Sequence, residues 1–449
     1  MNLREIDREF VWHPYTAASA SAQLKIPVIT RGSGIHLYDE AGERYIDAAS
    51  SWWVCNLGHG HPELVAAIKE QADVLQHSIL GTLSHPSIIK LSEQLCGLFK
   101  DNARHVFYAS DGACAVEAAI KIAIQYWENV GKARKNRIAS LEAAYHGDTL
   151  GCVAVAYDKS VHGRYSAIIT PGIQVPFNAC RTCTIGADGR STPCACFEPM
   201  AKALEEHADE LAAVIVEPMC QGTGGMRIYS ANYLKRLAEY CEKHDVLLIA
   251  DEIAMGFGKT GRMFAHQHAG IEPDIICIGK GLTNGYLPMS AAIVKNHIYE
   301  TFTDEKWFDH GHTFAGNPIC AALALKVLEV YRRDRVVDRV ASLSEILAAR
   351  LQTLVGKPRI VDVRVLGMIA AVELDDADYA VAGAPINLVD RVLEEMYARK
   401  IMIRSLGRVV YLLLPLISSA DTVAETADRL VETIRLVVGE EHKSAVAAV

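Results

Sequence analysis

The chain has 449 residues, of which half are hydrophobic and 22% are charged, a composition typical of a globular enzyme. This length exceeds what one hydrophobic core usually organises, so we expect at least two domains. The formal net charge of −9 disfavours a nucleic-acid partner, and without an apolar run of membrane-spanning length we expect no membrane partner. The charged N-terminus does not resemble a secretory signal, which together with unpaired-looking cysteines predicts a cytoplasmic protein.

The N-terminal segment, residues 1–60, is predicted to hold short strands, including a hairpin over residues 34–47, and to join a smaller domain. From residue 61 onward, amphipathic helical patterns alternate with short apolar strands. The predicted helices cover residues 63–75, 86–99 and 114–127, and the predicted strands cover residues 105–109, 137–141 and 213–216. This alternation predicts an α/β fold, with a large domain over residues 61–325 whose mainly parallel sheet is flanked by helices.

After about residue 325 the pattern changes to a long helical stretch, expected over residues 321–354, followed by four strand candidates. These strands are predicted at residues 360–365, 369–374, 402–404 and 409–414. The pattern predicts a smaller α+β domain over residues 326–449. Its last ten residues are expected to form a frayed tail.

Two apolar runs in the large domain each end in a charged residue. Residues 246–250 lead directly into Asp251, and residues 274–279 lead directly into Lys280. Such runs indicate strands buried on both faces, and parallel sheets bind their ligands at the carboxyl ends of the strands. A cofactor that needs both an amine and an acid is pyridoxal phosphate, whose aldehyde forms a Schiff base with lysine and whose ring nitrogen needs an acidic partner. For either residue alone, a capped strand end or an ion pair is the simpler interpretation.

Two further turns follow predicted strands. Residues 110–114 open the helix after the strand at 105–109, and there Gly112 lets the backbone approach a phosphate at a helix N-terminus. Tyr145 follows the strand at 137–141 and offers an aromatic face for the pyridine ring. Each signal is weak alone, since many strand–turn–helix joints and buried aromatic residues look alike, but with Asp251 and Lys280 they describe one cofactor site.

Residues 250–258, followed by Asp274 and Lys280, resemble the signature of the class III aminotransferases, which have the fold type I of pyridoxal phosphate enzymes. The resemblance extends over nearly the whole chain. It implies a homodimer with shared active sites that moves an amino group from a small amine donor to a carbonyl acceptor in ping-pong order. Motifs at residues 12–16, 50–53, 221–227 and 310–314 resemble the branch of the class that acts in biotin synthesis.

The resemblance also assigns roles. Lys280 matches the Schiff-base lysine, Asp251 the partner of the ring nitrogen, and Tyr145 the residue stacked on the ring. Ser110, Gly112 and Ala113 match phosphate-loop positions, and Thr313 matches a threonine that reaches the phosphate in the neighbouring subunit. The wall of the substrate pocket is expected to comprise Tyr15, Trp52, Trp53 and Tyr411. Arg404 matches an arginine that binds a substrate carboxylate, and Glu217 matches a residue that often pairs with a pocket arginine.

The chain departs from its class at two positions near this site. The phosphate loop reads Ser110 to Ala113 where the class commonly has Asp-Ser-Gly-Ser, so Ala113 removes one hydroxyl donor. His312 stands where the adenosylmethionine-using enzymes carry proline and resembles the lysine-using branch and many ω-aminotransferases. The donor is therefore open between adenosylmethionine and lysine, and a broad ω-aminotransferase acting on diamines or ω-amino acids with pyruvate or 2-oxoglutarate is the alternative.

A cysteine-rich insert, residues 177–197, is the larger departure. It carries Cys180 and Cys183 as a CxxC pair, and Cys194 and Cys196 as a CxC pair. Four closely spaced thiols indicate a ligand set for zinc or for an iron–sulfur cluster, and the sequence leaves both open. Free thiols and disulfides are the simpler alternatives. We expect a structural role for a metal beside the substrate entrance; a rival interpretation is an inactive aminotransferase fold in which this cluster serves metal sensing or scaffolding.

Overall fold

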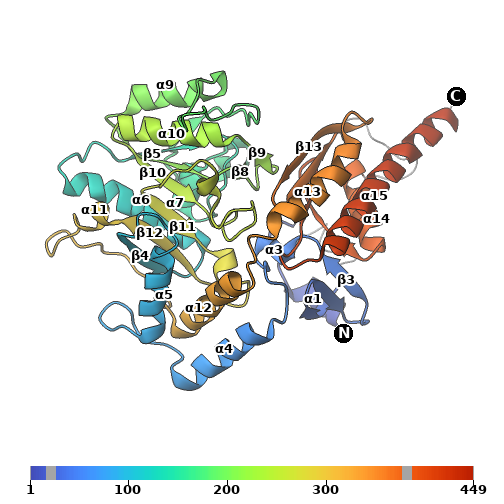
Figure 1. Cartoon of the computed structure of the whole chain (residues 1–449), viewed down its shortest axis with the longest axis horizontal. Helices are drawn as coiled ribbons and strands as arrows, with labels where there is room; N and C mark the ends of the chain where they lie inside the picture. The colour runs from blue at the N-terminus through green and yellow to red at the C-terminus, as the bar shows by residue number, and fades with distance from the viewer. Residues whose placement is uncertain (1, 17–26, 377–386, 448–449) are drawn as a thin grey trace.

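The computed structural model describes residues 2–16, 27–376 and 387–447, and of residues 440–447 it describes the backbone alone. Figure 1 shows a larger body around one sheet and a smaller body that contains both the N-terminal strands and the C-terminal helices. Helices α4 (Pro62–Val74) and α12 (Pro318–Arg333) pack against each other along one side of the molecule, where the chain passes between the two bodies.

The larger body is built on a seven-stranded sheet in the order β4-β12-β11-β10-β7-β5-β6. All neighbouring pairs are parallel except those made by β12, so the predicted mainly parallel sheet is confirmed. The strands are β4 (Arg104–Ala109), β5 (Arg137–Leu141), β6 (Ile173–Val175), β7 (Leu211–Val216), β10 (Leu247–Asp251), β11 (Ile275–Ile278) and β12 (Ser290–Lys295). The sequence pattern predicts neither β6 nor β12.

Helices cover both faces of this sheet, as the fully buried strands require. In β10, Leu247 and Ile249 pack with the residues of α6 (Gly112–Asn129), whereas Leu248 packs with those of α9 (Glu198–His207) and α10 (Ala231–Lys243). Alternate side chains of one strand therefore enter two separate cores. Other helices of this body are α5 (Pro86–Cys96), α7 (Leu150–Val155), α8 (Lys159–His162) and α11 (Asn296–Tyr299).

The smaller body contains two four-stranded sheets. One has the order β1-β2-β3-β15 and joins β1 (Ile29–Ser33), β2 (His36–Asp39) and β3 (Arg44–Asp47) to β15 (Ile401–Met402). The other has the order β13-β14-β17-β16 and comprises β13 (Ile360–Leu366), β14 (Ile369–Leu374), β17 (Val409–Leu413) and β16 (Arg404–Leu406). The parallel pairing of β3 with β15 brings the N-terminal segment beside the C-terminal part, and the predicted hairpin over residues 34–47 is present as β2 and β3.

Two details of the predicted helices are wrong. The helix expected over residues 321–354 is two helices, α12 and α13 (Val340–Leu351), separated by a turn in which Arg335 has a φ of 49°. Of the frayed tail expected over residues 440–449, residues 440–447 form the end of α15 (Ala420–Ala447), and residues 448–449 lie outside the described residues. The remaining helices are α1 (Leu3–Phe10), α3 (Ser50–Trp53) and α14 (Leu388–Ala398).

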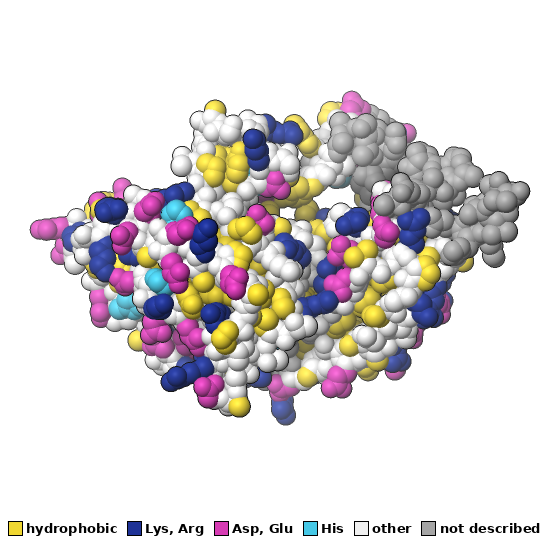
Figure 2. Space-filling view, turned by 90° about the horizontal axis from the view of Figure 1, so that it is seen from above, with side chains coloured by type: hydrophobic (Ala, Val, Ile, Leu, Met, Phe, Trp, Pro, Cys, Tyr) yellow, Lys and Arg dark blue, Asp and Glu magenta, His cyan; other side chains and the backbone are white. Residues whose placement is uncertain are grey.

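Acidic and basic side chains are intermingled on the face seen in Figure 2 rather than gathered by sign. Among the helices of the described ranges, none combines the length and the hydropathy that a membrane span requires.

Candidate active site

A cavity of about 460 Å³ opens at the carboxyl ends of β4, β5, β7, β10 and β11. Seven of the residues predicted from the sequence line it: Trp53, Gly112, Ala113, Tyr145, Glu217, Asp251 and Lys280. Residues distant in sequence meet here because parallel strands all deliver their following loops to one edge of the sheet. The carboxyl-end position expected for Asp251 and Lys280 is the position they occupy.

Lys280 begins a short 3-10 helix, η4 (Lys280–Leu282), directly after β11. Its φ of 43° lies in the left-handed region that a residue with a side chain rarely adopts, and such strain is concentrated at functional sites. The Nζ lies 5.2 Å from the centre of the Trp53 ring, and no hydrogen bond to it occurs within the described residues. Burial lowers the pKa of Lys280, although the nearby Asp251 and Glu217 oppose this effect. An unpaired amine with a lowered pKa is a suitable nucleophile.

Asp251 ends β10 and is almost completely buried. Its Oδ2 accepts a hydrogen bond of 2.8 Å from Nδ1 of the buried His146, and its Oδ1 accepts one of 3.1 Å from the backbone amide of Ile253. The two contacts fix the orientation of the carboxylate in the cavity wall. Because Asp251 only accepts, the imidazole hydrogen of this contact lies on Nδ1, and Nε2 of His146 has no partner in the described part of the chain.

Tyr145 is held by its backbone and by its hydroxyl group. Its amide donates to Oε2 of Glu217 at 3.1 Å, and its hydroxyl donates to Oδ2 of Asp148 at 2.8 Å. The hydroxyl of Tyr15 also donates to Asp148 and lies 3.4 Å from the hydroxyl of Tyr145. Asp148 therefore ties the N-terminal segment to the turn that follows β5.

The loop before α6 presents backbone amides to the cavity. Asp111 is the N-cap, and its carboxylate accepts from the amide of Cys114 at 3.1 Å. The amides of Gly112 and Ala113 make no hydrogen bond within the described residues, so both remain available to an anion. A Cβ on Gly112 would lie 3.0 Å from Ile253, which explains why glycine allows this close packing. Ser110 and Thr313 do not line the cavity, and Thr313 is exposed.

The residues of the predicted pocket wall form two pairs, and the members of each pair contact one another. Nε1 of the buried Trp53 donates to the hydroxyl of Tyr411 at 3.0 Å. The guanidinium of Arg404 lies 4.1 Å from the centre of the Trp52 ring, a cation–π contact, and no hydrogen bond from its donors occurs within the described residues. The rings of Tyr15 and Trp52 are 5.7 Å apart, which connects the second pair to Tyr145 and hence to the cavity.

Among the described residues, Glu217 makes no ion pair with an arginine of the kind that its class often has. The buried carboxylate instead accepts hydrogen bonds from the amides of Tyr145 at 3.1 Å and Gly222 at 2.8 Å. Burial raises the pKa of Glu217 to about 7. Two backbone donors satisfy this side chain without a charged partner, so it acts as a brace between the turn after β5 and the hairpin of β8 (Cys220–Gln221) and β9 (Arg227–Ile228).

Seven cavity residues were given no role from the sequence: Asp111, His146, Gly147, Asp148, Thr149, Ile253 and Ala254. The four residues 146–149 directly follow the predicted Tyr145, and Ile253 and Ala254 follow Asp251 by two and three residues. Their closeness in sequence to a predicted residue is the only signal that could have identified them. The contacts that define their roles join different loops and are not visible in the sequence.

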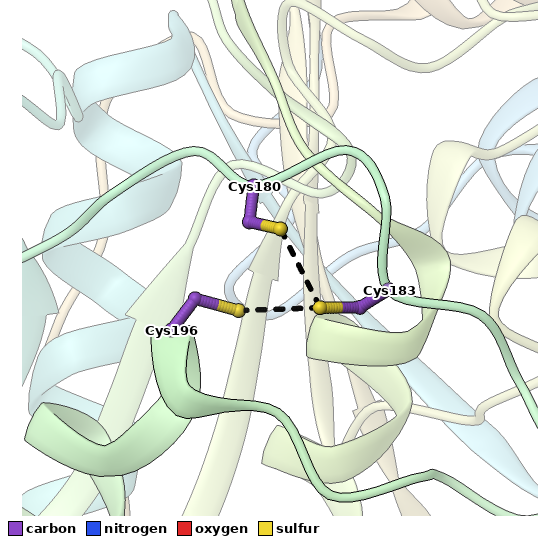
Figure 3. A group of neighbouring side chains, drawn as sticks. All are labelled: Cys180, Cys183 and Cys196. Atoms are coloured by element: carbon purple, nitrogen blue, oxygen red, sulfur yellow. Dashed lines mark hydrogen bonds between the residues drawn. The ribbon is translucent and has the colours of Figure 1, made fainter.

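The cysteine-rich insert brings its thiols together. The Sγ atoms of Cys180 and Cys183 are 3.4 Å apart, and those of Cys183 and Cys196 are 3.6 Å apart, as Figure 3 shows. These three sulfurs all lie within 4.8 Å of one another. Burial and the neighbouring Cys180 thiol raise the pKa of Cys183 to about 11. The fourth predicted ligand, Cys194, does not belong to this close group, and its Sγ accepts a hydrogen bond of 3.7 Å from Nδ2 of Asn232. All twelve cysteines are free thiols.

A pyridoxal phosphate molecule suits the donor set of the cavity. Two free amides face the phosphate position, an aromatic ring and Ile253 stand at the sides, and a buried carboxylate and an unpaired amine stand in its walls. The arrangement provides the acidic partner and the lysine that this cofactor requires. The exposed carboxylate of Asp111 lies in the same loop as these amides, and its charge opposes a phosphate.

Comparisons with known proteins agree with this geometry. The family model described as "Aminotransferase class-III" matches residues 16–434. The chain is 37% identical over 447 residues to an adenosylmethionine-8-amino-7-oxononanoate aminotransferase from Geobacter sulfurreducens, covering 97% of this chain and 98% of the relative. An enzyme with the same name from Staphylococcus aureus is 35% identical, covering 95% of this chain and 96% of the relative.

Solved structures give the same result. The adenosylmethionine-8-amino-7-oxononanoate aminotransferase from Methanocaldococcus jannaschii matches with a TM-score of 0.88 and 32% identity, covering 97% of this chain and 98% of that chain. A transaminase from the marine bacterium Virgibacillus matches with a TM-score of 0.87 and 29% identity, covering 98% and 99%. The chain therefore belongs to the class III aminotransferases, enzymes of pyridoxal phosphate fold type I.

Proposed function

We propose that this aminotransferase converts 8-amino-7-oxononanoate into 7,8-diaminononanoate in biotin synthesis, with adenosylmethionine or lysine as the amino donor. The observation that carries the proposal is the full-length similarity to relatives named for this reaction. Arg404 beside Trp52 supports it, because the substrate bears a carboxylate that a guanidinium binds well. Complementation tests the proposal: a strain that requires diaminopelargonate should grow without it when it carries the cloned gene, and should not grow when it carries the Lys280→Ala version.

Pyridoxal phosphate supplies an aldehyde that exchanges amines and a protonated ring that withdraws electrons. The residues proposed to hold it are Asp251 at the ring nitrogen, Tyr145 and Ile253 on its faces, and the amides of Gly112 and Ala113 at the phosphate. Ser110 belongs to the same loop. With the cofactor bound, Lys280 would hold its aldehyde, and the freed amine would be the group that accepts and returns the proton at the substrate carbon. Its lowered pKa suits both tasks.

Serine in place of Asp111 is expected to tighten cofactor binding. Removal of one exposed negative charge near the phosphate relieves a screened repulsion of roughly 1 kcal/mol, or about fivefold in the dissociation constant. Serine preserves the cap of α6. Titration of the cofactor-free enzyme with pyridoxal phosphate, followed by absorbance, measures the change. Asp158→Ser is the matched control, since Asp158 caps α8 in the same way but lies outside the cavity. Weaker binding by the Asp111 variant would show that this carboxylate positions the loop.

Lysine in place of Arg404 is expected to raise KM for 8-amino-7-oxononanoate by about 10- to 100-fold with little change in kcat. Lysine keeps the charge but loses the bidentate geometry, and hydrogen bonds to charged groups contribute about 1.5–3 kcal/mol. Steady-state kinetics with this substrate and with an amine that lacks a carboxylate measure the effect. Arg408→Lys, on the same hairpin and 3.7 Å from Glu373, is the control. An equal loss with both substrates would contradict the assignment.

The alternative function is a broad ω-aminotransferase. It is supported by His312 and by the similarity to an omega transaminase from Pseudomonas jessenii, with a TM-score of 0.86 and 28% identity. Half-reaction spectra with adenosylmethionine, lysine, putrescine and alanine decide between the donors. Rapid conversion by putrescine and alanine, with none by the first two, would favour the alternative.

The proposed enzyme is a homodimer in the cytoplasm, with a large domain of residues 61–325 and a small domain of residues 326–449 joined by residues 1–60. Exposed aromatic side chains near Thr313, namely Trp307 and Phe314, suit a subunit interface in which Thr313 approaches the partner's phosphate. Twelve free thiols suit a reducing compartment. Sedimentation equilibrium tests the dimer.

The four cysteines of the insert are proposed to bind a metal centre, either zinc or an iron–sulfur cluster. The support is the grouping of Cys180, Cys183 and Cys196, together with the place of Cys194 in the same insert, two residues before Cys196. Four soft thiolate ligands suit both centres. Transamination requires no redox step, so the role proposed for the metal is structural.

A further inference from the structure

The cysteine-rich insert contacts the C-terminal sheet through one residue between its first two cysteines. The Arg181 side chain donates to Oδ1 of Asp362 at 2.8 Å and to the carbonyl oxygen of Val363 at 3.3 Å. Both partners belong to β13, at the edge of the sheet that also carries Arg404 on β16 and Tyr411 on β17. The loop that bears the thiols therefore touches the sheet that supports the substrate wall.

The other side of the insert is anchored to the large domain. The carbonyl oxygen of Cys180 accepts from the amide of Ser230 at 3.0 Å. The buried side chain of Asn232 accepts from the amide of Thr192 at 2.7 Å and donates to its carbonyl oxygen at 3.0 Å and to Sγ of Cys194 at 3.7 Å. Ser230 and Asn232 cap and begin α10, so the thiols lie between this helix and β13.

Hydrogen bonds also connect Asp362 to the cavity wall through a series of residues. Oδ2 of Asp362 accepts from Arg364 at 3.2 Å, and the largely buried Arg364 donates to the carbonyl oxygen of Gly225 at 3.0 Å. Gly225 lies in the turn between β8 and β9. In that turn the amide of Gly222 donates to Glu217, which braces Tyr145.

We infer that a metal held by Cys180, Cys183, Cys194 and Cys196 clamps the C-terminal sheet to the large domain and so fixes the substrate wall. The inference rests on the metal centre proposed above. Residues 178–194 contain no helix or strand, so little but the thiol group and a few hydrogen bonds holds Arg181 in place. Bonds to a metal close this loop and remove its conformational freedom.

The sulfur spacing bears on which metal is bound. Four bonds of about 2.3 Å to one zinc ion give tetrahedral sulfur–sulfur edges of about 3.8 Å. The observed 3.4 and 3.6 Å are close to that edge. In a four-iron cluster each thiolate binds a different iron, which holds the sulfurs further apart. The described spacing favours a single tetrahedral ion.

Metal analysis of the purified enzyme tests the centre itself. We expect one zinc per chain or, for a cluster, iron with acid-labile sulfide and a brown colour; either result supports the centre and identifies it. The double variant Cys180→Ser/Cys183→Ser should lose the metal, and Cys96→Ser, a partly buried thiol outside the insert, should keep it. A wild-type enzyme without metal, after separate anaerobic treatment with zinc and with iron and sulfide, would overturn both the centre and the clamp.

Hydrogen exchange tests the clamp separately. Removal of the metal should accelerate exchange of the β13 amides several-fold and raise KM for the carboxylate-bearing substrate, while cofactor absorbance stays unchanged. Arg181→Ala keeps all four thiols, so it should retain the metal yet reproduce the faster exchange in β13, even if the cysteine variant fails to fold. Unchanged exchange in the metal-free enzyme and in Arg181→Ala would overturn the clamp and leave the metal centre and the aminotransferase function standing.

Discussion

Alanine in place of Lys280 is expected to reduce turnover by roughly four orders of magnitude or more, the scale seen when a covalent catalyst is removed. The structure places this amine at the end of β11 with a strained backbone and with no hydrogen bond among the described residues. Its pKa is lowered by burial, which favours the neutral, nucleophilic form of the amine. Without it, neither attachment to the cofactor nor the proton transfer between carbons has a suitable group.

The measurement combines single-turnover kinetics with absorbance. Wild type should show the yellow band of a lysine-bound cofactor, and Lys280→Ala should bind the cofactor without that band. Lys259→Met is a stringent control, because Lys259 is a buried lysine whose pKa burial lowers to about 7. If the yellow band persisted in Lys280→Ala and vanished in Lys259→Met, the assignment of the reactive amine would be wrong. A wild-type chain that never developed the band would favour the inactive, metal-sensing alternative.

The parts of this site that could be predicted from the sequence are those set by one strand and the residue after it. The apolar runs before Asp251 and Lys280 are buried strands with neighbouring positions in the sheet, so their common location at one edge followed from the parallel topology. The turn at Tyr145 was predictable for the same reason. By contrast, β12 runs antiparallel between β4 and β11, and its short apolar pattern does not reveal its direction or its place.

The contacts between loops could not be predicted, because they depend on distances that no local pattern encodes. His146 against Asp251 is one example, and the two backbone amides that satisfy Glu217 are another. For Glu217 the resemblance to the class suggested an arginine partner, but the hairpin of β8 and β9 brings the amide of Gly222 to the carboxylate instead. The grouping of the thiols was predictable from their spacing, whereas the contact of Arg181 with β13 required the tertiary structure.

Asparagine in place of Asp251 is expected to lower kcat by roughly 10²- to 10⁴-fold, the range of effects seen when a charge that assists proton transfer is lost. The negative charge of Asp251 raises the pKa of the cofactor's ring nitrogen and so keeps it protonated. Asparagine has nearly the same shape: its Oδ1 can accept from the amide of Ile253, and its Nδ2 can donate to Nδ1 of His146 once the imidazole hydrogen lies on Nε2, so we expect folding to be preserved. The loss should therefore arise from charge rather than from geometry.

The pH profile of activity distinguishes a loss that arises from the missing charge from a loss that arises from altered geometry. Without the carboxylate the ring nitrogen loses its proton at a lower pH, so activity of Asp251→Asn should fall at a lower pH than that of wild type. Asp274→Asn is the matched control: this carboxylate precedes β11, accepts from the amide of Leu248 at 2.9 Å and pairs with Lys295 at 2.9 Å. It should lower the unfolding temperature while leaving the pH profile unchanged. If Asp251→Asn kept the wild-type profile with only a lower unfolding temperature, Asp251 would be a structural residue and the cofactor ring would lie elsewhere.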